Sequence, residues 1–590
     1  MNEHLPVKPR YPQAFPPDEA SSWRRIRQYA VPRRMIEQAT ARRLAGDWGG
    51  ACAAAHVGCT VDLAEVAAGS GAETAARLDD DLRHLAPDLV RWHLPRYLRG
   101  RTTLRPGQRV LLASYGAPGD GPHLYITPLK MIDGPQRLTL RFGKLGERSL
   151  EQVQDWRLAR HLWDARRVSE LLDRCGGGTR PPFRNAGGSP RGAAELPVDD
   201  PGPGDPTGHT EWVTLLADRG ATDQACKAAE ITVDPTEPEF GYYTPPPLIQ
   251  VLAAYPLALT RLEPEIRLLD AAGRGGCFRL PYQGGAITFE LRARRGLIDV
   301  GRSRNGLRIK MVNRKEAAGI PLLPEACWRR LPDLDLLRFG DIAPGELHPL
   351  VSVGLFPARA KRATDGPPGP GARPPGPTRV RCRGEWHEVR PLDGGLRTQH
   401  TAEEERRERA MRALGGPVTG CFAVQQAWTS GTGWLPKALR AQRREFFSQV
   451  QHGETTEVLR LLDAGTDPFI RDGRQRTLLH LLHLVDHETM LPRLLAAGLD
   501  LEARDHHHRT PLHVAVGEGP VALVQALLDA GARTDVLDDS DRSLPHLILH
   551  HRRKELRSLY DAVLRDYPKL VDNLYISWED LDDWEERDDE

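Results

Sequence analysis

Thr510-Pro511-Leu512-His513 decides the fold of the C-terminal part of this chain, because related tetrapeptides stand 33 residues before and after it. These are Thr477-Leu478-Leu479-His480 and Ser543-Leu544-Pro545-His546. Two further sets keep the same spacing, namely Asp472, Asp505 and Asp538, and Gly465, Gly498 and Gly531. A constant period of this length indicates supersecondary units that are repeated and stacked on one another.

The residues of one unit explain its structure. The Thr510 hydroxyl can cap a helix, and Pro511 suits the first helical position because that position needs no N–H donor. A second apolar run with helical spacing follows, and Gly531 can adopt the left-handed conformation that ends a helix. The stripe of this second helix is expected to be Val521, Leu523, Val524, Leu527 and Leu528. We therefore expect helix pairs to begin near Thr477 and Thr510, with Leu495 and Leu528 buried at equivalent places.

A 33-residue period with Thr-Pro-Leu-His at the start of a helix resembles the ankyrin-repeat family. The resemblance covers about residues 443–570 and about four units, of which the terminal ones are atypical. Three other stretches, Trp23–Pro32, Asp80–Pro95 and Phe422–Gly433, resemble ankyrin-repeat domain proteins of actinobacteria such as Streptomyces, and this likeness assigns no activity. The fold class expected is a multidomain α+β N-terminal part followed by an all-α ankyrin-repeat solenoid.

The family resemblance implies a protein partner, bound through the hairpin tips and the concave side of the array. The tip residues expected to contact that partner are Arg474, Gln475, His507, His508, Asp541 and Arg542. The residues expected to maintain the repeat are Thr477, His480, Gly498, Thr510, Pro511, His513 and Gly531. Within the family, the histidine of each tetrapeptide forms a hydrogen bond with the hairpin turn.

Metal ligands, cofactors and catalytic residues are not expected. The triplet His506-His507-His508 suits metals chemically, but three consecutive residues in a tip cannot easily converge on one ion. His480, His483 and His487 are separated by a turn. The eight cysteines contain no Cys-x-x-Cys pair, which argues against a disulfide framework and a zinc ribbon. Two Cys–His pairs can be drawn, Cys421 with His400 and Cys226 with His209, but the sequence places neither pair together.

Composition shifts divide the chain into eight segments. These are a helical N-terminal region (1–100), short strands plus a helix (101–174), a Gly/Pro-rich linker (175–208), an α+β region with an antiparallel meander (209–357), a second linker (358–378), a hairpin plus helices (379–441), the repeats (442–572) and an acidic tail (573–590). Within the second segment, Ser149-Leu150-Glu151-Gln152 is expected to cap a helix that runs to Leu172. In the tail, Trp578 is expected to pack against the last repeat, while the acidic end is expected to stay mobile because its charges repel one another.

Three classes of function stay open at this stage. The first is a cytoplasmic interaction or scaffold protein, since the polar residues Met1–Pro17 lack the apolar core of a signal peptide and no apolar run would span a membrane. The second is an effector or enzyme with an unrecognised catalytic domain in residues 1–357. The third is a nucleic-acid-associated regulator that uses the Arg-rich helix at Ser21–Gly46, although a net charge of +1 makes nucleic acid an unexpected partner. No membrane partner is expected.

Overall fold

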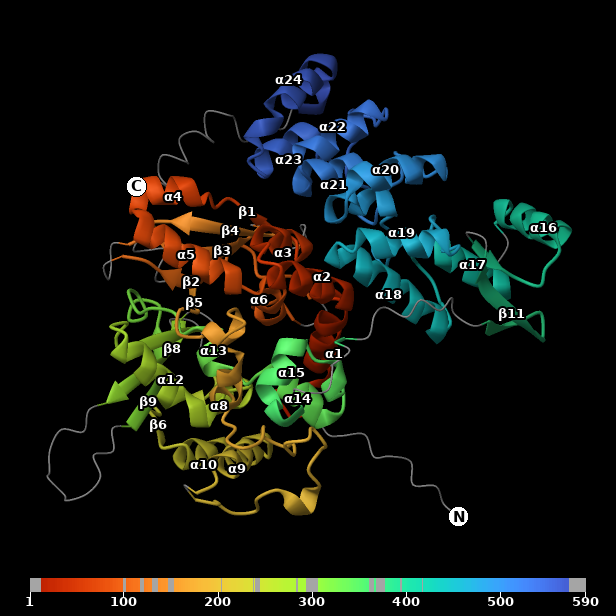
Figure 1. Ribbon diagram of the computed structural model, residues 1–590. Helices are drawn as coiled ribbons and strands as arrows, with labels where there is room; N and C mark the ends of the chain where they lie inside the picture. The colour runs from red at the N-terminus through yellow and green to blue at the C-terminus, as the bar shows by residue number, and fades with distance from the viewer. Residues whose placement is uncertain are drawn as a thin grey trace, which may run out of the picture. The chain divides into compact units, whose positions relative to one another are not determined.

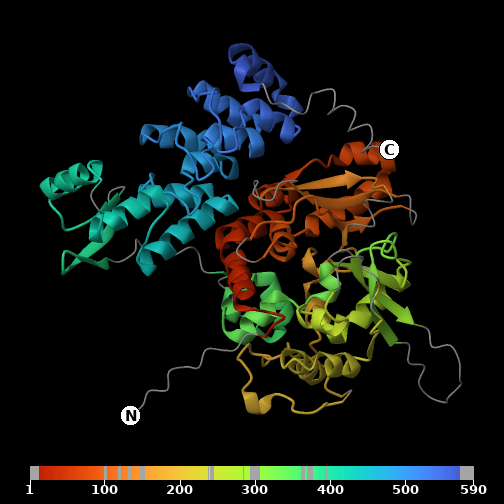
Figure 2. The ribbon, with the colours of Figure 1, turned by 180° about the vertical axis from the view of Figure 1, so that it is seen from behind.

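The computed structural model describes residues 12–98, 102–116, 121–129, 136–146, 153–202, 204–236, 238, 245–282, 285–292, 306–359, 366–367, 377–392, 395–415 and 418–571. The chain divides into two compact units, Met1–Leu129 with Arg137–Gly369, and Lys130–Gln136 with Pro370–Glu590 (Figures 1 and 2). The division at residue 369 falls inside the 358–378 linker expected from the sequence, and all the segment boundaries given above remain predictions. The predicted acidic tail lies outside the described residues.

The first unit begins with helices packed on a five-stranded sheet. The helices are α1 (Pro17–Arg25), the π-helix η1 (Ile26–Ala30), α2 (Arg33–Leu44), α3 (Trp48–Ala54), α4 (Leu63–Ser70), α5 (Ala72–His84) and α6 (Pro87–His93). The strands are β1 (Val57–Cys59), β2 (Val110–Ser114), β3 (His123–Pro128), β4 (Leu138–Gly143) and β5 (Gln154–Asp155), in the order β1-β4-β3-β2-β5. Strands β2, β3 and β4 are antiparallel neighbours, and β1 and β5 pair in parallel at the two edges.

A second sheet follows in the same unit. Its strands are β6 (Ile231–Val233), β7 (Cys277–Tyr282), β8 (Gly285–Arg292) and β9 (Gly306–Asn313), in the order β6-β9-β8-β7. The predicted antiparallel meander is confirmed for β7, β8 and β9, whereas β6 pairs in parallel with β9. The helices of this region are α9 (Pro206–Asp218), α10 (Thr222–Ala228), α11 (Leu248–Ala253), α12 (Leu259–Ala271), α13 (Glu325–Trp328), α14 (Pro332–Phe339) and α15 (Pro349–Leu355), with the 3-10 turns η5 (Pro344–Glu346) and η6 (Pro357–Arg359).

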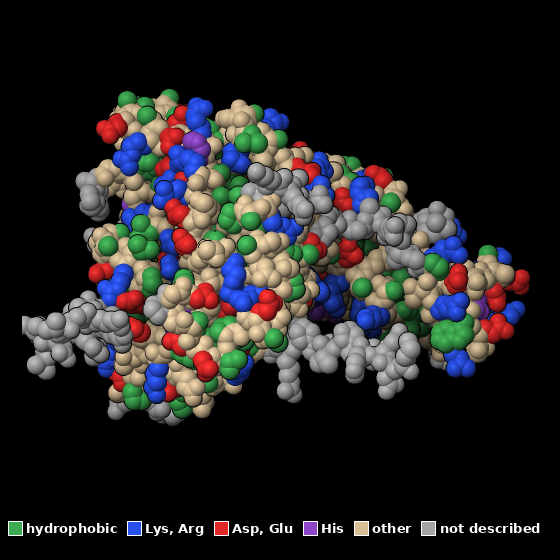
Figure 3. Space-filling model, turned by 60° about the horizontal axis from the view of Figure 1, so that its bottom comes forward, with side chains coloured by type: hydrophobic (Ala, Val, Ile, Leu, Met, Phe, Trp, Pro, Cys, Tyr) green, Lys and Arg blue, Asp and Glu red, His purple; other side chains and the backbone are tan. Residues whose placement is uncertain are grey.

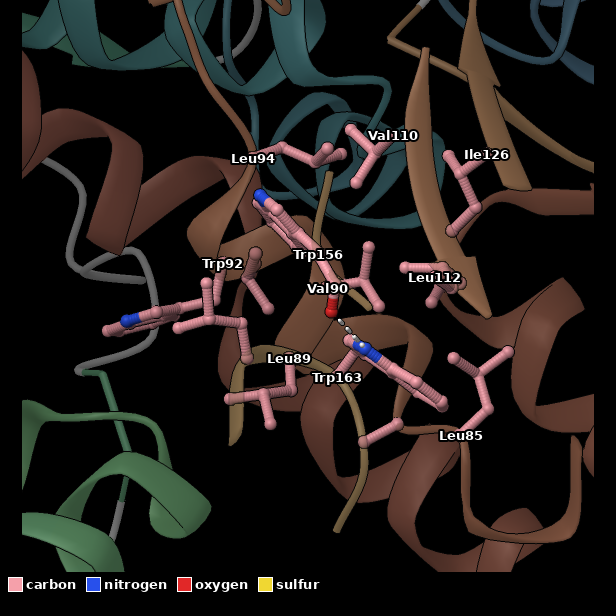
Figure 4. Close-up of a cluster of buried hydrophobic side chains, with 14 of the residues drawn as sticks. Leu85, Leu89, Val90, Trp92, Leu94, Val110, Leu112, Ile126, Trp156 and Trp163 are labelled. Atoms are coloured by element: carbon pink, nitrogen blue, oxygen red, sulfur yellow. Dashed lines mark hydrogen bonds between the residues drawn. The ribbon is translucent and has the colours of Figure 1, made fainter. Parts of the chain in front are cut away.

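The helix predicted to run to Leu172 is wrong. Residues 153–174 instead form strand β5, the 3-10 turns η2 (Arg160–Leu162) and η3 (Val168–Glu170), and the short helix α8 (Leu171–Arg174). The apolar residues whose spacing suggested one face of a helix are buried in the core without forming that helix. Trp156 and Trp163, for example, pack beside α6 and β2 (Figure 4). The Trp163 indole N–H donates to the Trp156 carbonyl at 3.2 Å. Tertiary packing therefore overrides the local pattern here.

The second unit opens with a small sheet and two helices. Strands β10 (Thr378–Cys382), β11 (Glu385–Leu392) and β12 (Gly395–Arg397) are antiparallel neighbours in that order. Helix α16 (Ala402–Ala413) begins with the predicted capping box, because the Thr401 N–H donates to Glu404 Oε2 at 2.9 Å and the Glu404 N–H to Thr401 Oγ1 at 3.3 Å. Helix α17 (Gly420–Ser430) lies beside the hairpin (Figures 1 and 2).

Four helix pairs complete the second unit. They are α18 (Lys437–His452) with α19 (Thr455–Asp463), the 3-10 helix η7 (Leu478–Leu484) with α20 (His487–Ala496), α21 (Pro511–Glu518) with α22 (Val521–Asp529), and α23 (Leu544–His550) with α24 (Arg557–Asp566). The 3-10 turns η8 (Lys554–Leu556) and η9 (Pro568–Val571) flank the last helix. One hydrophobic core joins these pairs to β10, β11 and α17, and the buried Trp428 belongs to it while Trp434 is exposed.

The predicted helix starts are confirmed at Leu478 and Pro511, but three details differ. The first helix after Thr477 is a 3-10 helix, and Val521, which begins α22 and was expected to be in its buried stripe, is exposed. The prediction that Leu495 and Leu528 are buried is wrong, since both are half-buried at equivalent positions and the residues before them, Leu494 and Leu527, are the buried ones. Gly498 and Gly531 have φ of 87° and 93°, which is the left-handed conformation expected at the ends of α20 and α22.

Candidate protein-interaction surface

Three turns with the same hydrogen bonds connect the helix pairs. In the middle turn, Asp505 Oδ1 accepts from the N–H groups of His507 and Arg509, both at 2.9 Å. Its Oδ2 accepts from the Arg509 guanidinium at 3.0 and 2.8 Å. Burial alone would raise the pKa of Asp505, but the Arg509 side chain and the backbone N–H donors hold it below its ordinary value. The Asp-x-x-x-Arg spacing therefore encodes a clamp that closes the turn.

The other two turns repeat this clamp. Asp472 accepts from the N–H groups of Arg474 and Arg476 at 2.8 and 2.9 Å, and from the Arg476 side chain at 2.8 Å. Asp538 accepts from the N–H groups of Ser540 and Arg542 at 2.9 Å, and from the Arg542 side chain at 2.9 Å. The residue before each arginine has a left-handed backbone, with φ of 61° at Gln475, 55° at His508 and 56° at Asp541.

Backbone hydrogen bonds tie each turn to the next. The His506 N–H donates to the Arg474 carbonyl at 3.0 Å, and the Asp539 N–H donates to the His507 carbonyl at 3.0 Å. His506 Nδ1 lies 3.0 Å from the Arg474 carbonyl, and His507 Nδ1 lies 3.1 Å from Asp539 Oδ2. Two rings of the histidine triplet thus face protein groups, and the triplet does not converge on a metal position. The three tips form one continuous row.

The tetrapeptide histidines hold the turns from inside, as the resemblance implied. His513 Nδ1 lies 2.8 Å from Thr510 Oγ1, and its Nε2 lies 3.1 Å from the Val536 carbonyl. His480 does the same with Thr477 Oγ1 at 2.9 Å and with the Arg509 carbonyl at 3.0 Å. Burial lowers the pKa of both imidazoles to about 4, so they are neutral at pH 7. His483 Nε2 lies 3.2 Å from Glu518 Oε2, so His480 and His483 contact different partners.

The side chains at the outermost positions of the three turns are exposed. Arg474 marks the first tip, His506, His507 and His508 the second, and Asp539, Ser540 and Asp541 the third. Gln475 and Arg542 are half-buried, and the Arg542 guanidinium also belongs to the clamp with Asp538. The row thus changes from basic at Arg474, through imidazoles, to acidic at Asp539 and Asp541. A ligand that lies along it meets an ordered change of charge.

A comparison of the sequence with models of protein families agrees with the repeated turns and helix pairs. Residues 447–538 match the family model described as ankyrin repeats, in three copies. Ankyrin repeats generally bind protein partners on extended surfaces of stacked repeats. No curated protein matches the chain, so the finer resemblance to actinobacterial proteins gains no support.

Two features of the first unit bear on the other classes of function. Trp23 and Tyr29, the aromatics of the Arg-rich N-terminal helices, are buried and cannot stack on exposed bases. Arg27 is buried as well, paired with Asp333 at 2.8 Å and placed 4.4 Å from the Trp92 ring centre. On the face that Figure 3 shows, Lys and Arg side chains lie among Asp and Glu side chains. None of the helices in the described ranges has the length and apolar composition of a membrane span.

A cavity of about 100 Å³ lies in the first unit, between η1, α8, α9, α12 and α14. His93, His161 and Cys175 line it, together with Arg174 and Glu325. Burial lowers the pKa of both imidazoles well below the ordinary value and raises the pKa of Cys175 to about 12, so the thiol stays protonated. Arg174 pairs with Glu265 and Glu325 with Arg329. Both carboxylates are therefore held in ion pairs with arginines. Elsewhere in this unit, His209, which the sequence allowed to be drawn as a pair with Cys226, contacts Asp200 at 3.1 Å.

One group of side chains was missed by sequence reasoning. Cys382, His387, His400 and Cys421 place one ligand atom each within 4.8 Å of one another. The structure thus brings together Cys421 and His400, which the sequence gave no reason to join. Their separations along the chain fit no zinc-finger spacing, and only the strand alternation of residues 378–382 carried a signal, because it puts Val380 and Cys382 on the same buried face.

Proposed function

We propose that this chain is an interaction protein whose ankyrin repeats form a short solenoid and bind a protein partner along the row of tips. The observation that carries the proposal is the set of three clamped turns, linked by backbone hydrogen bonds, with exposed side chains at each crest. Because the backbone of the three turns is already held by hydrogen bonds, little of its conformational entropy would be lost when a partner binds. Arg474, Gln475, His507, His508, Asp541 and Arg542 are the proposed contacts.

The proposed partner carries acidic groups opposite Arg474 and basic groups opposite Asp539 and Asp541. Complementary charge of this kind sets orientation and speeds association more than it adds affinity. Cytoplasmic location belongs to the same proposal, and it is supported by the eight cysteines, none of which forms a disulfide.

Site-specific photocrosslinking in the full-length protein tests the proposal. A photoreactive residue at position 474 or 507 is expected to capture one partner, whereas the same residue at the exposed outer-helix positions Ala522 and Gln525 is not. Capture from all four positions alike would contradict a binding surface at the tips.

A double variant then measures the energetic contribution of the tips. Arg474→Glu with His507→Ala changes exposed side chains and leaves the three Asp–Arg clamps and the left-handed residues intact. Affinity for the captured partner is expected to fall by about tenfold, which corresponds to roughly 1.4 kcal/mol. Unchanged affinity, with an unchanged circular dichroism spectrum, would place the binding surface elsewhere.

A further inference from the structure

The group Cys382, His387, His400 and Cys421 draws its members from two strands, one connecting segment and one helix of the second unit. Cys382 ends β10, His387 lies on β11, His400 precedes α16, and Cys421 stands in the first turn of α17. Strand register explains the first two. Val380 lies opposite His387, so His387 shares a face of the hairpin with Val380 and with Cys382, two residues further on.

The backbone is shaped for this convergence. Arg383 and Gly384 have φ of 52° and 91°, which makes the two-residue turn that brings β11 back beside β10. At the start of α17, Gly420 has φ of +59°, and a Cβ there would stand 2.5 Å from Cys382 Sγ. Only a glycine therefore lets the Cys421 end of α17 approach the Cys382 thiol. Arg383 further ties the turn to α16 through Glu408 at 3.3 Å.

The distances between the four ligand atoms fit tetrahedral coordination of one metal ion. His400 Nε2 lies 3.1 Å from His387 Nδ1 and 3.4 Å from Cys382 Sγ. A zinc ion bound to sulfur at about 2.3 Å and to nitrogen at about 2.0 Å holds its four ligand atoms roughly 3.3–3.8 Å apart. Since all four atoms already lie within 4.8 Å of one another, closure on an ion needs shifts of only about 1 Å.

We infer that Cys382, His387, His400 and Cys421 bind one Zn²⁺ as a structural site at the entrance to the repeats. Two thiolates and two imidazoles are a donor set that favours zinc over oxygen-seeking cations. Four protein ligands close the coordination sphere, which is the arrangement of structural rather than catalytic zinc. A catalytic thiol would use one imidazole and would not need the second cysteine and the second histidine.

Neighbouring residues complete the site. His400 Nδ1, the nitrogen turned away from the group, lies 3.7 Å from Glu404 Oε2, where a carboxylate can orient a ligating imidazole. The Phe422 ring covers His400, with ring centres 4.5 Å apart. The ion would fasten the β10–β11 hairpin to α16 and α17, and a small hairpin sheet of this kind is marginally stable without such support. Because Trp428 of α17 belongs to the core of the repeats, the site anchors their first end.

Metal analysis of the full-length protein, purified with an affinity tag free of histidine, tests the inference. About one zinc per chain is expected, and the double variant Cys382→Ser/Cys421→Ser is expected to lose it. The matched controls are Cys59→Ser, an exposed thiol of the first unit, and His507→Ala in the exposed triplet, and both are expected to keep the zinc. Zinc absent from the wild type, or retained by the double variant, would overturn the site.

A spectroscopic measurement on the wild type keeps the test independent of whether the variants fold. Replacement of the metal by Co²⁺ is expected to give the strong visible absorption of tetrahedral cobalt together with thiolate-to-cobalt charge transfer. A cobalt spectrum without the thiolate bands would place the metal on other ligands and refute the assignment. Neither result depends on partner binding, so a failed zinc site and a failed interaction surface are distinguishable.

Discussion

At the scale of single residues, the tetrapeptide histidines make the repeats sensitive to acid. The Thr510 N–H points at His513 Nδ1 from 3.3 Å, so that protonation would set one N–H against another. Burial lowers the pKa of His480 and of His513 to about 4, against about 6.5 in the unfolded chain, so the unfolded state binds more protons between these values. The stabilisation that depends on these neutral histidines is therefore fully present above pH 6.5. The free energy of unfolding falls as the pH drops toward 4, by up to about 3 kcal/mol for each histidine. Urea unfolding followed by circular dichroism at pH 7 and pH 5 measures this loss. The double variant His480→Asn/His513→Asn is expected to be less stable at pH 7 and less dependent on pH, and an identical pH dependence would contradict the argument.

Gly420 provides a second prediction at the scale of one residue. Gly420→Ala adds a Cβ that meets Cys382 Sγ at 2.5 Å and its Cα at 2.9 Å, on a left-handed backbone. The expected cost is about 1–3 kcal/mol of stability for the hairpin and α17. Gly395→Ala is the matched control, because nothing lies within 4 Å of its Cβ position in the neighbouring strand β12. Hydrogen exchange of residues 378–430 is expected to rise in the first variant alone, and equal exchange in both would argue against a close approach at Gly420.

At the scale of elements, the Asp–Arg clamps are expected to stabilise the turns. Asp505→Ala removes the acceptor of two backbone N–H groups and leaves the Arg509 guanidinium without its carboxylate. A loss of about 1–2 kcal/mol in the free energy of unfolding is expected, because two partly buried N–H donors and the Arg509 guanidinium then lack their acceptor. Asp529→Ala is the control, since this exposed aspartate accepts only from the Gln525 side chain at 2.7 Å among the contacts described. Equal effects of the two variants in denaturant titrations would contradict the clamp.

Elements also show how far the sequence could predict the structure. Period and caps predicted the helix pairs and the strands β2, β3, β4, β10 and β11, because local propensity and tertiary packing agree there. The 3-10 form of η7 could not be predicted from Thr477-Leu478-Leu479-His480. The second helix starts at His487, ten residues after Thr477, against eleven residues from Thr510 to Val521. A 3-10 helix rises about 2.0 Å for each residue and an α-helix about 1.5 Å. The seven residues of η7 therefore span about 14 Å, at least the length of about 12 Å that the eight residues of α21 span, although η7 has one residue fewer. Likewise, the approach of Cys382 to Cys421 depends on the register of β10 with β11 and on the position of α17. Neither of these can be predicted from the spacing of residues along the chain.

At the scale of the whole molecule, the two units have separate cores. The buried apolar clusters of the first unit draw on residues 15–356, and that of the second draws on residues 380–560. A cavity in one core is therefore expected to destabilise that unit alone. Leu512→Ala, at a fully buried position of α21, should lower the stability of the second unit by about 2–5 kcal/mol. Hydrogen-exchange mass spectrometry on the full-length variant is expected to show faster exchange across residues 378–571 and unchanged exchange in β2, β3 and β4. The reciprocal variant Leu112→Ala, fully buried in β2, should reverse this pattern. If either variant loosens both units, their folding is coupled and the division at residue 369 does not separate independent cooperative units.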